Sequence, residues 1–89
     1  MKIKSGFMLR KVGGRNVVVA VGAASREFNG IIKLNETGAF LWELLKTERT
    51  PEELTAALLA EYDIGEETAA ADVGAFLKKL EEAELLARD

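Results

Sequence analysis

With 89 residues, 48% of them hydrophobic and 30% charged, the chain has the balance of one globular domain over residues 1–89 and leaves no room for a second. It contains no cysteine and no histidine, which excludes disulfides, thiolate nucleophiles, the usual zinc sites and imidazole acid–base catalysis. Its 15 acidic and 12 basic residues give a formal charge of −3, so we expect no electrostatic attraction to nucleic acid or to anionic lipid.

The first residues carry no targeting signal. Residues 1–5 are partly charged, and no apolar run of signal-peptide length follows them. No stretch of the chain approaches the ~20 apolar residues of a membrane-spanning helix. We therefore expect a cytoplasmic protein with no membrane partner.

Two strand-like runs, residues 7–12 and 16–21, predict a β-hairpin. Gly13 and Gly14 lie between them, and two glycines can both adopt the positive φ of a type I′ turn. The second run is apolar on both faces and should be central in its sheet. The first run carries Arg10 and Lys11 and suits a sheet edge.

After a loop over residues 22–30, in which Phe28 is the expected anchor to the core, a short third strand is predicted at 31–34. It leads directly into a helix, since Asn35 has the side chain of an N-cap residue and Glu36 suits the positive end of the helix dipole. A strand of four residues tied to a helix is expected at a sheet edge, with part of its backbone unpaired.

The first helix, residues 36–46, places four apolar side chains on one stripe: Phe40, Leu41, Leu44 and Leu45. Trp42 lies at the margin of this stripe, where it can either complete the core or form a contact surface. The second helix has the strongest start signal in the chain, with Thr50 as N-cap, Pro51 at the first position and Glu53 completing a capping box.

The third helix, residues 66–84, shows two apolar stripes. The deeper one predicts the core contacts and consists of Ala69, Val73, Phe76 and Leu80. The shallower one consists of Ala70, Gly74 and Leu77, whose small members leave room either for a neighbouring helix or for a ligand. Leu85 and Leu86 are expected to fold back and close the core.

Three strands followed by three helices form a winged helix-turn-helix-like α+β arrangement, which raises DNA binding as a function. The third helix lacks the basic stripe of a recognition helix, because its charged residues are mostly acidic. They are Glu66, Glu67, Asp72, Lys78, Lys79, Glu81 and Glu82. Its acidic pairs sit at helix ends or on polar faces without metal-loop spacing, and Ser5 and Ser25 have no catalytic partner. We expect no enzyme activity, metal site or nucleic-acid partner.

The remaining function class is peptide binding by β-augmentation, in which an extended peptide pairs with an exposed strand and places its side chains against a helix. We predict that the edge is formed by Ile31, Ile32, Lys33 and Leu34, and the wall by Ala70, Val73, Gly74 and Leu77. The alternative is a homodimerising module in which two copies of the edge pair with each other.

Several segments together resemble the PqqD family, also called RiPP recognition elements, from about Phe7 to Leu86. They are residues 34–39 (LNETGA), 41–45 (LWELL) and 50–54 (TPEEL), followed by Asp72, Val73, Phe76, Leu77 and Leu80. The resemblance implies a small winged-helix-like domain that binds the leader of a ribosomally made precursor peptide and presents it to a radical SAM enzyme. Any iron–sulfur cluster or S-adenosylmethionine would belong to that enzyme, so this chain needs no cofactor. The resemblance covers pyrroloquinoline quinone biosynthesis and other peptide pathways alike.

Overall fold

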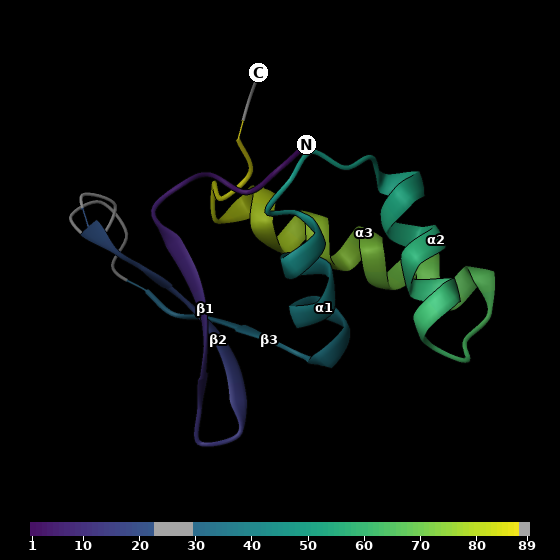
Figure 1. Ribbon diagram of the computed structural model, residues 1–89, viewed down its shortest axis with the longest axis horizontal. Helices are drawn as coiled ribbons and strands as arrows, with labels where there is room; N and C mark the ends of the chain where they lie inside the picture. Colours follow the sequence, from purple (N-terminus) through teal and green to yellow (C-terminus); the bar gives the residue numbers. More distant parts are fainter. Residues whose placement is uncertain (23–29, 88–89) are drawn as a thin grey trace.

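A three-stranded antiparallel sheet forms the first part of the fold, as seen in a computed structural model that describes residues 1–22 and 30–87. The strands are β1 (Phe7–Val12), β2 (Arg15–Ala20) and β3 (Ile32–Leu34), in the order β1-β2-β3. Figure 1 shows the sheet on one side of the molecule and the helices on the other. The expected anchor Phe28 lies outside the described residues.

The predicted hairpin between β1 and β2 is confirmed. Val12 pairs with Arg15 across a two-residue turn, and the two glycines between them have φ angles of 57° and 80°. Both values are in the region that a type I′ turn requires. Val17 and Val18 point to opposite faces of β2 and are both buried, as expected of a central strand.

The junction between β3 and α1 (Glu36–Leu44) is fixed by the predicted cap. The side-chain oxygen of Asn35 accepts hydrogen bonds from the Gly38 amide at 2.8 Å and from the Thr37 hydroxyl at 3.1 Å. A Cβ added at Gly38 would lie 3.0 Å from that oxygen and 3.3 Å from the Cβ of Leu34. Glycine at this position therefore lets the first turn of α1 approach the end of β3 closely.

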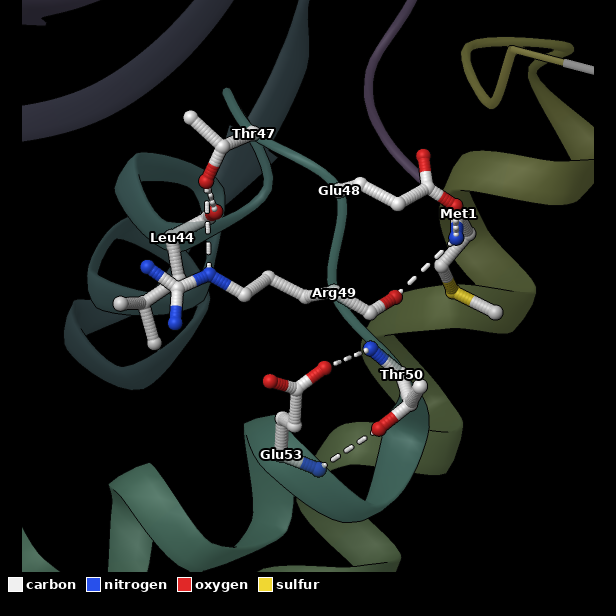
Figure 2. A network of polar contacts seen from close by, with 7 residues as sticks. All are labelled: Met1, Leu44, Thr47, Glu48, Arg49, Thr50 and Glu53. Atoms are coloured by element: carbon white, nitrogen blue, oxygen red, sulfur yellow. Dashed lines mark hydrogen bonds and ion pairs between the residues drawn. The ribbon is translucent and has the colours of Figure 1, made fainter.

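The segment between α1 and α2 (Pro51–Glu61) is held by the polar contacts drawn in Figure 2. The predicted capping box is present: the Glu53 amide donates to the Thr50 hydroxyl at 3.1 Å, and the Thr50 amide donates to the Glu53 carboxylate at 2.9 Å. The amino group of Met1 forms an ion pair with Glu48 and donates to the carbonyl oxygen of Arg49 at 3.1 Å.

Helix α3 (Glu66–Glu82) supplies the centre of the core, and its four predicted core residues are all buried. Trp42 is 1% exposed, so it completes the core and does not form a contact surface. The other largest buried side chains come from β2, from α1 and the residue after it, from α2, from α3 and from the segment that follows α3. They are Val18, Leu41, Leu45, Leu54, Leu58, Leu80 and Leu85. None of the helices in the described part of the chain is long and apolar enough to cross a membrane.

The N-terminal segment pairs with the C-terminal segment. An isolated bridge joins Ile3 to Leu86, the Lys4 amide donates to the carbonyl oxygen of Leu85 at 2.8 Å, and the Ala87 amide donates to that of Lys2 at 2.8 Å. Leu85 is fully buried, which confirms the expected return of the chain to the core. The architecture is the predicted α+β fold, a three-stranded antiparallel sheet followed by three helices.

Candidate peptide-binding site

Strand β3 pairs with β2 along one side, through Asn16 with Leu34, Val17 with Lys33 and Val18 with Ile32. No strand of residues 1–22 or 30–87 pairs with its other side, so β3 is an open edge as predicted. Leu34 is buried and Ile32 packs against the core, whereas the Lys33 side chain alternates to the opposite face of the sheet. Ile31 lies just before the strand and is 64% exposed.

The centre of this edge is the backbone of Lys33. Its carbonyl oxygen accepts a hydrogen bond from the Lys79 ammonium at 2.9 Å, which shows that this carbonyl points away from β2. Since the N–H and C=O of one residue in an antiparallel strand point to the same side, the amide of Lys33 faces the open edge too. The backbone of Lys33 thus turns one donor and one acceptor toward the open edge, and in the free domain the acceptor is bonded to Lys79.

A groove of about 170 Å³ runs beside this edge, between β3, the start of α1 and the facing side of α3. We call it the β3–α3 groove; its lining residues are Leu34, Asn35, Thr37, Gly38, Asp72, Ala75, Phe76 and Lys79. Its floor is apolar, with Leu34 and Phe76 largely buried and Ala75 exposed. Asp72 and Lys79 give its α3 side one charge of each sign.

The predicted wall lines a different groove from the one beside β3. Ala70, Val73, Gly74 and Leu77 line a hollow of about 550 Å³ between α2 and α3, the α2–α3 groove, together with residues of α2 such as Leu59. At about 100° per residue, the mean direction of these four positions differs by roughly 160° from that of Asp72, Ala75, Phe76 and Lys79. Val73 and Phe76 lie only about 60° apart, since both belong to the core stripe between the two grooves. The structure therefore does not bring the four predicted wall residues together with Ile31–Leu34 along one groove.

The neighbouring helix does not fill the space above the shallow stripe. A Cβ added at Gly74 would meet no heavy atom within 4 Å, and Ala70 is exposed. The rim of the α2–α3 groove carries Glu52 and Glu66. A larger hollow of about 700 Å³ borders the N-terminal segment and includes no residue of β3 or α3 in its lining.

Sequence reasoning missed the α3 residues that adjoin β3. Asp72, Ala75, Phe76 and Lys79 have the i, i+3, i+4, i+7 spacing of one helix face, which is a readable signal. Three of them are polar or small, however, so the face resembles a solvated one. The missing information was the direction from which β3 approaches α3.

Among the described residues, no group of three or more Asp or Glu side chains could hold a metal ion. Two of the described titratable groups have a displaced pKa, and neither of them lines either groove. The backbone hydrogen bond from Thr50 lowers the pKa of Glu53, and burial, with the negative charges of Glu36 and Glu61, raises the pKa of Tyr62.

The fold has relatives among solved structures. A search of the curated proteins found no match. Among solved structures, "TbiB1 in Complex with the TbiA(beta) Leader Peptide" is 27% identical, with a TM-score of 0.73 over 100% of both chains. "Lasso peptide synthetase B1 complexed with the leader peptide" is 18% identical and shares the fold, with a TM-score of 0.74 over 98% of this chain and 96% of that one.

The family comparison covers most of the chain. The family model for coenzyme PQQ synthesis protein D (PqqD) matches residues 7–86, from the start of β1 to the segment that pairs with the N-terminus. The matched range includes β3, both grooves and every helix. The chain therefore belongs to the PqqD family.

Proposed function

We propose that this protein binds the leader segment of a ribosomally made precursor peptide in the cytoplasm and presents it to a modifying enzyme. The observation that carries the proposal is the open edge of β3 beside the β3–α3 groove. An extended peptide can pair with such an edge through its main chain while a groove receives alternate side chains. The 27%-identical neighbour TbiB1, solved with a leader peptide, supports a peptide as the ligand.

In this proposal the main-chain contacts centre on Lys33, with Ile31 and Ile32 before it and Leu34 after it. The peptide side chains that point toward α3 enter the groove over Ala75 and Phe76. The wall predicted from the sequence, Ala70, Val73, Gly74 and Leu77, could contact the same peptide only where the peptide passes to the other side of α3. We therefore assign the first contacts to the β3–α3 groove.

The domain acts by binding, and the chemical step belongs to its partner. The family resemblance points to a radical SAM enzyme, which would bring its own iron–sulfur cluster and S-adenosylmethionine. Pyrroloquinoline quinone biosynthesis is one pathway of this kind, and other peptide products are compatible with the same site. Co-purification of the chain with the radical SAM enzyme encoded beside it, with and without precursor peptide, tests this partner.

The leader-binding proposal is tested by titrating the ¹⁵N-labelled protein with synthetic leaders from precursor genes that neighbour its own gene. We expect saturable shifts centred on the amides of Lys33, Leu34 and Ala75. A scrambled peptide of the same composition is the control. Absence of binding by every encoded leader, or shifts confined to α2, would contradict the proposed site.

The same open edge also supports the competing use, a homodimer through paired copies of β3. In that case peptide and partner copy exclude each other, because both need the backbone of Lys33. Light scattering with added leader peptide distinguishes leader presentation from homodimerisation. A presenting domain is monomeric once the peptide is bound, whereas a structural dimer does not dissociate.

A further inference from the structure

The outer face of the sheet is basic next to the open edge. This face carries Arg10, Arg15 and Lys33, and the three strands contain no acidic residue. Lys11 lies on the other face, because it pairs with Asn16, which pairs with Leu34. Arg10 pairs with Val17, and Val17 pairs with Lys33, so these three side chains form one row across the sheet. The row lies on the face opposite Ile32 and Leu34, because side chains alternate along β3.

The charge of this row is not neutralised within the described part of the chain. The ion pairs found there join Met1 to Glu48 and Lys46 to Glu43, and neither Arg10 nor Lys33 takes part in one. Arg10 and Lys33 are separated by two strand spacings, about 10 Å. A strand added at the edge would extend the row by one residue, directly beside Lys33.

An added strand must place its side chains on alternate faces. The residue opposite Lys33 projects onto the outer face, where its Cβ would lie about 4.5–5.5 Å from that of Lys33. Opposite charges in such a cross-strand position are favourable and like charges are unfavourable. The residues before and after it project toward α3, over the apolar side chains of Leu34, Ala75 and Phe76.

From this alternation we infer that the site selects an apolar–acidic–apolar triplet, with Lys33 as the residue that reads the central Asp or Glu. The inference rests on the proposed function and names the chemical class of its ligand. The triplet is symmetrical, so it holds whether the peptide runs parallel or antiparallel to β3. Asp72 and Lys79 carry opposite charges at the groove and add no net preference there.

The experiment is a selection with random 12-residue peptides displayed on phage, run against the wild-type protein, Lys33→Glu and Lys11→Glu. Lys11→Glu changes the net charge equally but lies on β1, the far edge of the same sheet. We expect wild type and Lys11→Glu to enrich the apolar–acidic–apolar triplet. Lys33→Glu should enrich Lys or Arg at the central position.

A binding measurement follows on one recovered peptide. Changing its central Glu to Gln should weaken binding to wild type about 2- to 5-fold, and changing it to Lys about 10-fold. The Lys peptide should regain affinity on Lys33→Glu. Circular dichroism checks that each variant is folded, and Lys33→Gln, which should lose the acidic preference without reversing it, serves if Lys33→Glu does not fold.

These results distinguish a failure of triplet selection by Lys33 from a failure of leader binding. The role of Lys33 in selecting the central Asp or Glu is contradicted if peptides without an acidic residue bind wild type, or if the acidic preference persists in Lys33→Glu. Either result leaves the leader-binding proposal intact. If the wild-type protein recovers no binding peptide and binds no encoded leader, the proposed function fails, and the inference fails with it.

Discussion

The ammonium group of Lys79 on α3 donates a hydrogen bond to the backbone carbonyl oxygen of Lys33 on β3, and the two atoms are 2.9 Å apart. This contact joins α3 to β3 beside the β3–α3 groove, which Lys79 lines. It also occupies the acceptor that a paired peptide would use. In the free domain, therefore, one backbone acceptor of the binding edge is already hydrogen-bonded to the Lys79 side chain.

Lys79→Met removes this competitor while keeping a long side chain of good helix propensity. The bond comes from a charged but solvent-exposed ammonium group, so we take its net contribution as about 0.5–1 kcal/mol and expect leader affinity to rise about 2- to 5-fold in an anisotropy titration. Lys78→Met, at the preceding position of α3, is the control because the Lys78 side chain forms no hydrogen bond or ion pair within the described residues. A loss of affinity in Lys79→Met would show that Lys79 holds the peptide itself.

Two adjacent residues of α3 distinguish the grooves. Ala75 lines the β3–α3 groove and Gly74 lines the α2–α3 groove, where an added Cβ has open space. Ala75→Leu should therefore weaken leader binding by about 10-fold or more, about 1.4 kcal/mol, without unfolding the domain. Gly74→Leu should leave binding unchanged and raise the free energy of unfolding by up to about 1 kcal/mol through helix propensity.

Peptide titration and urea unfolding on both variants provide the measurements. If Gly74→Leu blocks binding while the protein stays folded, the wall predicted from the sequence is part of the peptide site after all. If Ala75→Leu binds normally, the peptide does not enter the β3–α3 groove.

The capping box of α2 makes a pH-dependent contribution to stability. Because the Thr50 amide donates to the Glu53 carboxylate, the folded-state pKa of Glu53 lies below its usual value of 4.5. The resulting stabilisation is present above that usual value and is lost as the pH falls through the folded-state pKa. In Glu53→Gln, the part of the pH dependence of the unfolding free energy that comes from Glu53 should vanish. Urea unfolding of wild type and Glu53→Gln at pH 7 and pH 3 measures this difference.

Two further variants serve as comparisons for the unfolding measurement on Glu53→Gln. Thr50→Ala should lower the free energy of unfolding by about 1 kcal/mol at neutral pH, the typical cost of losing an N-cap. Glu52→Gln changes a carboxylate in the same turn of α2 that is outside the capping box, and it should keep the wild-type pH dependence. An unaltered pH profile in Glu53→Gln would refute the role of Glu53.

Lys33 should also keep the open edge from pairing with itself. If two copies of β3 paired about a two-fold axis at this residue, their Lys33 side chains would lie opposite each other, and like charges in that position are unfavourable. We expect the 9.7 kDa chain to scatter light as a monomer and Lys33→Val to self-associate more strongly. Lys78→Val is the control. A tight wild-type dimer that leader peptide does not dissociate would favour the homodimerising module.

Much of the fold was predictable because its signals are local. Paired glycines at 13 and 14, the Asn35 cap and the Thr50 capping box each act within a few residues, and all three are confirmed. The core stripe of α3 was predictable for a similar reason, since helical periodicity alone brings Ala69, Val73, Phe76 and Leu80 to one side.

The site was predictable only in part. The open edge follows from a short strand tied to a helix, but the α3 face that meets it depends on how the whole helix is rotated about its axis. That rotation is set by core contacts from distant segments, including Leu34, Leu41 and Leu85. The small residues Ala70 and Gly74 predict a groove on the side of α3 that faces α2. The side that faces β3 carries the charged residues Asp72 and Lys79, which are typical of a solvated helix face.

The pairing of Ile3 with Leu86 has a consequence for how the protein folds during its synthesis. Contacts this distant in sequence form late, because closing a long loop costs conformational entropy before the contact stabilises anything. The contacts within the hairpin and within each helix are local and do not depend on this pairing. The N-terminal segment, however, stays without its partner until residue 87 has emerged, and only then does Leu85 complete the core.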